Sequence, residues 1–211
     1  MQLQKALTRS SKADLLVELV QTVSGLLLVG FLWTHMLFVA SILLGVQAFN
    51  ALAHFMEQFR LLDVAVVFII ITVGAHVAAV LRRIPGRWQE QKIVWQHAKL
   101  IKHKDTWSWL FQAVTGSAML LLIIIHVFTV VYVGIDSKLS ADRVHSWLLW
   151  FYLVFLILAE YHASVGLYRS LVKWGFVKRR SLKNVLTVVT VCTIVLGCVS
   201  LWVFYSLGGS V

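Results

Sequence analysis

Four of the eight histidines lie inside long apolar runs, where an imidazole without a partner is costly. One of them, His126, stands in the middle of LLLIIIHVFTVVYV, the stretch from Leu120 to Val133. Moving a polar ring into hydrocarbon without a hydrogen bond or a metal costs several kcal/mol. We therefore expect each ring to have a hydrogen-bond partner, a metal ion or a polar cavity beside it; the four are His35, His76, His126 and His162.

The runs that carry these histidines are long enough to cross a membrane. Of 211 residues, 60% are hydrophobic and 13% are charged, and the mean hydropathy is +0.84, which leaves too little polar surface for a water-soluble domain. A helix needs about 20 apolar residues to span the hydrocarbon layer. We expect an all-α fold, an integral membrane bundle of five transmembrane helices forming a single membrane domain over residues 1–211, with spans at approximately 19–45, 63–81, 108–134, 147–168 and 185–207.

The basic residues predict the orientation of these spans. Of the 19 Lys and Arg, all but Arg60, Lys138 and Arg143 precede the first span or lie in the loops after the second and fourth spans. The positive-inside rule then places the N-terminus and both basic loops in the cytoplasm. The net charge of +10 is therefore expected to set topology and not to bind nucleic acid, and the loops could also meet an acidic partner or anionic membrane lipid.

The four histidines are expected to form two pairs at two depths. At about 1.5 Å per residue, His76 and His162 lie about 10 Å from the cytoplasmic edge, and His35 and His126 about 25 Å from it. Each pair comes from two different helices, which suits a haem with one imidazole on each face of its iron. Zinc would prefer four ligands at one depth, and a proton relay would favour a staggered series with carboxylates. Two b-type haems between the first four helices are the interpretation we favour, and ordinary hydrogen-bonded contacts between helices are the alternative.

Two acids stand out because acids are rare here. Glu160, two residues before His162, is the only acid in the interior of a predicted span, since Asp63 stands at the very start of the second; it is therefore expected to be functional or strongly hydrogen-bonded to a neighbouring helix. Glu57 lies in the amphipathic segment 46–62, which is expected to lie along the outer membrane interface. A solvated loop acid is the alternative interpretation for Glu57.

Several stretches resemble a known family: VQTVSGLLLVGFLWTHMLFVASILLG, FMEQF, AHVAAVLRRIPGRWQ, HAKLIKHKDTWSWLFQAVTGSAMLLLIIIHVFTV and LAEYHASVGLYRSLVKWG. They are similar to the cytochrome b membrane anchor of di-haem quinol:fumarate reductases and succinate:quinone oxidoreductases. The resemblance implies that His76 and His162 bind the iron of a proximal haem b, and that His35 and His126 bind the iron of a distal one. It further implies contacts to haem propionates from Gln21, Thr22, Trp109 and Lys173. For Trp109 and Lys173, plain anchoring at the membrane interface is the alternative.

The resemblance also implies a function. Glu57 would accept the proton of menaquinol, and Glu160 would take part in transmembrane proton transfer. The chain would be a multi-pass protein of the bacterial inner membrane and a subunit of an oxidoreductase complex with a flavoprotein and an iron-sulfur subunit; a dimer of such heterotrimers stays open. Because the chain has no nucleotide fingerprint or cysteine cluster, fumarate reduction is expected on a partner subunit.

Three alternative functions remain open at this point. An anchor of this kind could work in the reverse direction, as a succinate:menaquinone reductase, because both directions need the same parts. The chain could also be the cytochrome b subunit of a hydrogenase or a formate dehydrogenase. From another class, a haem-free transporter or assembly protein could use the four histidines along a proton path.

Overall fold

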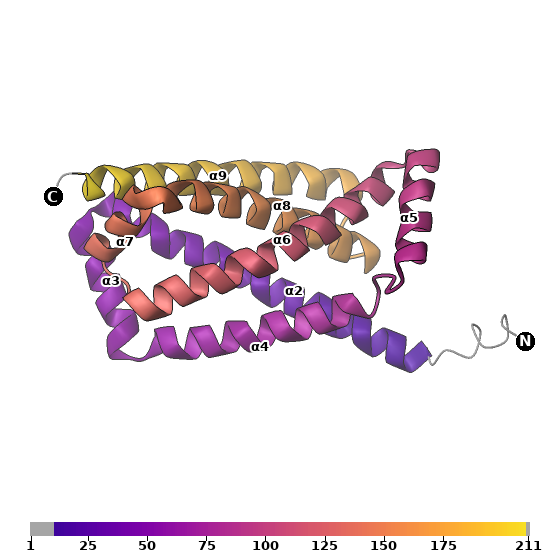
Figure 1. Ribbon diagram of the computed structural model, residues 1–211, viewed down its shortest axis with the longest axis horizontal. Helices are drawn as coiled ribbons and strands as arrows, with labels where there is room; N and C mark the ends of the chain where they lie inside the picture. The colour runs from indigo at the N-terminus through magenta and orange to yellow at the C-terminus, as the bar shows by residue number, and fades with distance from the viewer. Residues whose placement is uncertain (1–10, 210–211) are drawn as a thin grey trace, which may run out of the picture.

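A computed structural model describes residues 11–209, except for the side chains of Ser11, Lys104 and Asp105. Five long helices run along the molecule, and shorter elements cross its two ends (Figure 1). The long helices are α2 (Ser11–Ala40), α4 (Leu61–Leu81), α6 (Lys104–Val133), α8 (Leu149–Lys173) and α9 (Arg179–Gly208). The short elements are η1 (Ser41–Leu44), α3 (Val46–Gln58), α5 (Trp88–Ile101), α7 (Ser137–Arg143) and η2 (Val144–Leu148).

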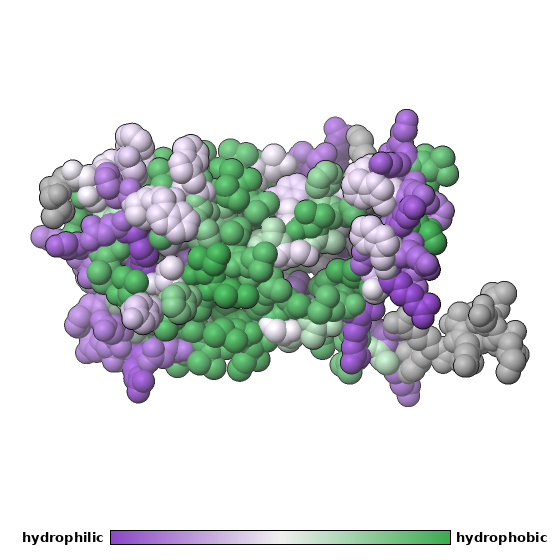
Figure 2. All heavy atoms as spheres, in the orientation of Figure 1, coloured by the Kyte–Doolittle hydropathy of each residue, from purple (hydrophilic) through white to green (hydrophobic). Residues whose placement is uncertain are grey.

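The prediction of five membrane-spanning helices is confirmed for the described residues. Five helices are long and apolar enough to cross a membrane, the fourth of them running through α7, η2 and α8. Figure 2 shows the corresponding surface, a wide band of hydrophobic residues with hydrophilic residues gathered at both ends. Most of the helices extend beyond the predicted spans, because helical hydrogen bonding continues after the apolar run has ended.

Four of the long helices form two antiparallel pairs. α2 packs against α4, and α6 packs against α8, while α9 lies along α8 and also contacts α2. α2 and α6 run in the same direction, towards the end of the molecule that α3 and α7 cross, and α4 and α8 run back (Figure 1). We call this end the α3 end and the opposite one, where α5 lies, the α5 end.

The α3 end contains the best-packed hydrophobic core. Its buried members come from η1, α3, α7, η2 and α9 and are Ile42, Phe49, Ala141, Val144, Leu201 and Phe204. Asn50 joins α3 to α7, since its Oδ1 accepts a hydrogen bond from the Ser137 backbone N–H at 2.8 Å. Asp136 caps α7 in the same way through Leu139 N–H at 2.7 Å. This packing joins α3, α7 and α9 at one end of the bundle and holds α3 across it.

Glycines with positive φ mark two of the helix ends. Gly134 (φ 91°) follows α6 and Gly175 (φ 72°) follows α8, each in the left-handed region that only glycine adopts without strain. At Gly134 the exposed carbonyl accepts a hydrogen bond from the Arg143 guanidinium at 2.9 Å. The chain therefore reverses sharply after each of these helices, which keeps α6 beside α8 and α8 beside α9.

Candidate functional site

A large cavity lies between the α2–α4 pair and the α6–α8 pair. Its volume is about 1610 Å³, and all four helices line it. Ligand pockets for a single drug-sized molecule are typically about 300–1,000 Å³, so this cavity has room for more than one large group. The four histidines singled out from the sequence, one on each helix, all line it: His35, His76, His126 and His162.

The histidines lie close to one another in two pairs along the cavity. The ring centroids of His35 and His126 are 5.9 Å apart. His76 and His162 are near enough for a charge on one ring to affect the other. Since bonds from a metal to imidazole nitrogen are about 2 Å long, 5.9 Å is close to the spacing of two rings on opposite sides of one metal ion.

Hydroxyl groups of neighbouring helices contact the second pair. Ser24 Oγ on α2 lies 3.0 Å from His76 Nδ1, and Thr115 Oγ1 on α6 lies 3.2 Å from His162 Nδ1. Both hydroxyl residues are buried. His126 differs, because its Nδ1 is buried and makes no hydrogen bond with any described residue. One histidine pair is thus fixed by side chains of adjacent helices, and the other has at least one ring nitrogen without a partner.

Two glycines leave space for the rings of His76 and His162. A methyl group at Gly25 would lie 3.3 Å from His76 Cε1, and one at Gly116 would lie 2.8 Å from His162 Cε1. Gly30 and Gly74, also in the spans, have nothing within 4 Å of such a methyl group and are not among the described residues that line the cavity. Gly25 and Gly116 are therefore the glycines whose lack of a side chain makes room for the rings of His76 and His162.

The α5 end of the cavity contains polar and basic groups. Gln21 and Trp109 line it, as the sequence interpretation expects for contacts to propionates. The buried Gln21 Oε1 has no hydrogen-bond partner among the described residues, so this oxygen could accept a hydrogen bond from a bound group. Arg83 and Arg169 also line the cavity and add positive charge there. A carboxylate-bearing ligand fits this end, because guanidinium, indole N–H and amide groups all donate hydrogen bonds.

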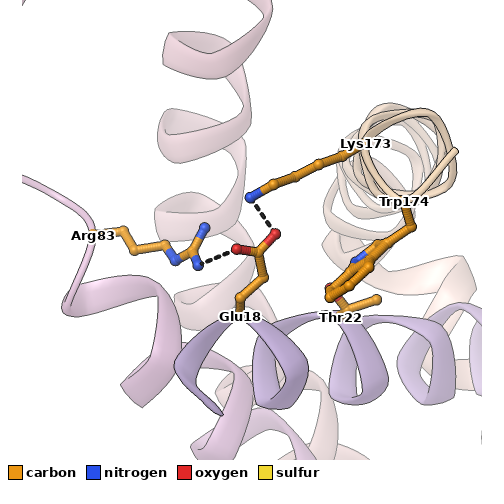
Figure 3. A network of polar contacts seen from close by, with 5 residues as sticks. All are labelled: Glu18, Thr22, Arg83, Lys173 and Trp174. Atoms are coloured by element: carbon orange, nitrogen blue, oxygen red, sulfur yellow. Dashed lines mark hydrogen bonds and ion pairs between the residues drawn. The ribbon is translucent and has the colours of Figure 1, made fainter. Parts of the chain in front are cut away.

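Glu18 holds together three helices at this same end (Figure 3). Its carboxylate pairs with the Lys173 ammonium group of α8 and, at 3.2 Å, with the Arg83 guanidinium just beyond α4. Beside it, Trp174 Nε1 donates a hydrogen bond to Thr22 Oγ1 at 3.1 Å. Thr22 and Lys173 thus contact other side chains, and neither is among the described residues lining the cavity.

Glu57 lies where the cavity reaches the α3 end. It is exposed on α3 and lines the cavity together with Arg60 and Asp63, which pair with each other at 3.1 Å. Arg143 enters the same end from α7, and its guanidinium donates to the carbonyl of Thr129, at 3.2 Å, and to that of Gly134. The structure therefore brings Glu57 to the same cavity as the histidines, at an opening with several charged groups.

Glu160, on α8, is not among the described residues that line this cavity. It is completely buried, at 0% exposure, and neither carboxyl oxygen has a hydrogen bond of good geometry from a described residue. The nearest polar groups are the Trp33 indole on α2 and the Thr190 hydroxyl on α9. Thr190 in turn contacts Ser164, one turn further along α8. Glu160 is thus an acid enclosed by helices, with a short row of hydroxyls next to it.

No three His, Cys, Asp or Glu side chains of the described chain converge on a point where they could hold a metal ion. The histidines act in pairs, and this arrangement disfavours a zinc site of four ligands. A planar group held between two imidazoles needs only the pairs that are present.

Comparison with known proteins shows the family. Residues 89–199, just over half of the chain, match the family described as the succinate dehydrogenase/fumarate reductase transmembrane subunit. The chain belongs to this family. The fumarate reductase cytochrome b subunit of Helicobacter pylori is 34% identical over 197 residues, which cover 86% of this chain and 76% of that protein. The subunit of the same name from Wolinella succinogenes is 31% identical over 210 residues, covering 89% and 80%.

Sequence reasoning missed several residues that lie near the histidines or line the cavity. Ser24 and Thr115 were not singled out, because a hydroxyl in an apolar helix commonly bonds only to its own backbone. A usable signal was present, since each is followed by a glycine and preceded by a valine. Arg83 and Arg169 were counted only as topological charges, although both line the cavity.

Proposed function

We propose that this chain is a di-haem cytochrome b membrane subunit of a quinol:fumarate oxidoreductase complex. The observation that carries the proposal is the single cavity lined by four histidines in two pairs. Relatives 31–34% identical over most of the chain are fumarate reductase cytochrome b subunits, and a cytochrome b contains haem b. Enzyme kinetics would decide whether the complex reduces fumarate or oxidises succinate in the cell.

The residues around the cavity fit two haems. His76 and His162 would hold the proximal iron, and His35 and His126 the distal iron. A haem that is bound in this way supplies one-electron transfer between its ferric and ferrous states. Three buried polar atoms of cavity-lining residues have no partner among the described residues, which supports a bound group between the helix pairs; they are Gln21 Oε1, Gln112 Oε1 and His126 Nδ1.

The propionates are proposed to lie at the α5 end of the cavity for the proximal haem. Gln21 and Trp109 would donate hydrogen bonds to them, and Arg83 and Arg169 would supply positive charge. Lys173 could contribute only if it left or shared its ion pair with Glu18. Thr22 is less suited to this role, because it is not among the described residues that line the cavity.

The two ends of the cavity would have different tasks. We place the α5 end in the bacterial cytoplasm, because the described basic loops gather there. Menaquinol would be oxidised at the α3 end, where Glu57 would accept a proton as general base. Electrons would then pass from the His35–His126 level to the His76–His162 level and leave through the α5 end. Glu160, enclosed beside this route, would hold or move a proton that accompanies electron flow.

Two partner subunits would complete the reaction. An iron-sulfur subunit would receive the electrons at the α5 end, and a flavoprotein subunit would reduce fumarate. Purification of the complex from its native membrane tests this arrangement, together with turnover of menaquinol with fumarate and of succinate with menaquinone. The expected result is co-purification of both subunits and a higher rate in the fumarate direction. Recovery with hydrogenase or formate dehydrogenase subunits would contradict the proposal.

The exposed lysines at the end of α5 are expected to dock the iron-sulfur subunit. Lys99, whose Nζ lies 5.4 Å from the Trp95 ring centroid, and Lys102 are both exposed. Replacing both with glutamate should weaken binding of the iron-sulfur subunit several-fold at low salt. The difference should shrink in 1 M salt, where the screening length falls to about 3 Å. Lys138→Glu, exposed at the other end, is the matched control. Unchanged association of the double variant would leave topology as the only role of these charges.

A methyl group at Gly116 is expected to disturb the proximal haem. It would come within 2.8 Å of His162 Cε1, so the ring or α6 must move, at a cost of about 1–3 kcal/mol. In Gly116→Ala we expect the proximal haem to be lost or its midpoint potential to change, while the distal haem keeps its spectrum. Gly74→Ala adds the same methyl group in open space and serves as control. Identical haem content and potentials in both variants would show that His162 is not held where we place it.

A further inference from the structure

An internal repeat underlies the two helices that run in the same direction. Residues 21–35 and 112–126 share the pattern Gln-x-Val-Ser/Thr-Gly, followed by nine residues and a histidine. The first copy lies in α2 and the second in α6. Eleven residues, about three helical turns, separate the hydroxyl from the histidine in each copy, so both face the same side of their helix. Each copy therefore presents a hydroxyl and a glycine at one depth and a histidine at the other.

The hydroxyl of the first copy has a defined role as a hydrogen-bond acceptor. Ser24 Oγ is 2.6 Å from the carbonyl oxygen of Val20, and a carbonyl can only accept, so the hydroxyl proton points there. The contact with His76 Nδ1 at 3.0 Å must then run the other way, from the ring N–H to the oxygen. The main-chain carbonyl of Gln21 is a second acceptor near this ring. His76 is accordingly protonated on Nδ1, and its Nε2 has a free lone pair.

The second copy repeats these contacts around His162. Thr115 Oγ1 donates to the Phe111 carbonyl at 2.8 Å, so it accepts from His162 Nδ1 at 3.2 Å. The Gln112 main chain also approaches the His162 ring, as that of Gln21 approaches His76. The Gln112 side chain adds a hydrogen bond from Nε2 to the His162 carbonyl at 2.9 Å. Two helix pairs thus make the same arrangement of a hydroxyl and a histidine ring.

We propose that Ser24 and Thr115 are positioning residues of the proximal haem site, each fixing the tautomer and ring orientation of the histidine on the neighbouring helix. The proposal rests on the proposed function, since it concerns the ligands of one haem. A hydrogen bond from Nδ1–H to an oxygen makes the imidazole a stronger electron donor, which favours ferric over ferrous iron. The two hydroxyls together therefore lower the midpoint potential of the proximal haem.

The distal pair is not expected to respond to these hydroxyls. No described residue offers a hydrogen bond to His126 Nδ1, and the repeat places Ser24 and Thr115 three turns away from His35 and His126. Changes at the hydroxyls should therefore affect one haem and leave the other as an internal reference. This selectivity separates a positioning role from a general loss of stability.

The test is a redox titration of the purified complex, followed by visible spectra and by electron paramagnetic resonance of the ferric haems. In Ser24→Ala and in Thr115→Val, the midpoint potential of the proximal haem should rise and its low-spin ferric signal should shift. The distal haem should keep both properties. Ser24→Thr and Thr115→Ser retain a hydroxyl and should restore wild-type behaviour. Ser206→Ala and Thr187→Val are controls, because among the described residues these two hydroxyls donate to carbonyl groups of their own helix, α9.

The possible outcomes distinguish failure of the positioning role from failure of the proposed function on which it rests. Loss of the proximal haem in Ser24→Ala, with retention in Ser24→Thr, would also support a positioning role. An unshifted proximal haem, or equal shifts of both haems, would overturn it while two haems in the wild-type protein still supported the proposed function. A wild-type protein without haem would contradict the proposed function itself.

Discussion

Replacing His126 with alanine is expected to lower the haem content of the purified protein from two haems per chain to one. His126 is one of two rings that face each other across the distal part of the cavity, 5.9 Å from His35 by ring centroids. Without its imidazole, the distal iron would lose one of two axial ligands and with it most of its affinity for the site. His76 and His162 keep all their contacts, so the proximal haem should remain.

The measurement is a haem assay per polypeptide combined with a redox titration. His54→Ala is the matched control, because His54 is exposed on α3 and is not among the described residues that line the cavity. The control should keep both haems and both potentials. Loss of both haems in His126→Ala, or of neither, would be incompatible with two independent pairs.

Glu57→Gln is expected to stop quinol oxidation while leaving both haems in place. The amide keeps the shape of the side chain but cannot accept a proton, and loss of a general base typically lowers a rate by about 10²–10⁴-fold. Glu57 is exposed at the α3 end of the cavity and is not one of the residues proposed to bind a haem iron, which are the four histidines. Both haems should therefore remain reducible by dithionite, and electron flow from a chemical donor to fumarate should survive.

Two further variants show whether the effect belongs to Glu57. Asp63→Asn removes another acid that lines this end, and it should retain most of the quinol oxidation rate. Glu160→Gln should have a different effect and alter the pH dependence of the haem midpoint potentials. Glu160 is enclosed by helices and is not among the described residues that line the cavity, so it is not expected to take the quinol proton. If Glu57→Gln oxidises menaquinol at the normal rate, the quinol site is elsewhere, and the α5 end becomes the first place to look.

The features that sequence reasoning can predict are those that depend on one helix alone. The depth expected for His35 or His162 follows from its distance in residues from a helix end, because the rise per residue is constant. The five spans follow from apolar length for the same reason. Segment 46–62 was expected along the interface, and α3 with its turn crosses the end of the bundle there.

The contacts that sequence reasoning did not anticipate depend on how two helices meet. The rotation of α8 brings Trp174 Nε1 to the Thr22 hydroxyl, and Glu18 pairs with Lys173. The expected contacts of Thr22 and Lys173 with a propionate stay predictions. The contact between Ser24 and His76 joins residues 52 apart in the sequence and needs the packing of α2 on α4. Such contacts are set by helix rotation and crossing, which a pattern within one helix does not determine.

Haem content and redox titration of the purified wild-type complex test the pairing of the four histidines most directly. The expected result is a b-type α band after reduction with dithionite, two haems per chain, and two separable midpoint potentials. Two haems with distinct potentials would follow from two histidine pairs in different surroundings, one bonded to hydroxyls and one not. A single haem per chain, or a reduced spectrum without a b-type α band, would contradict it.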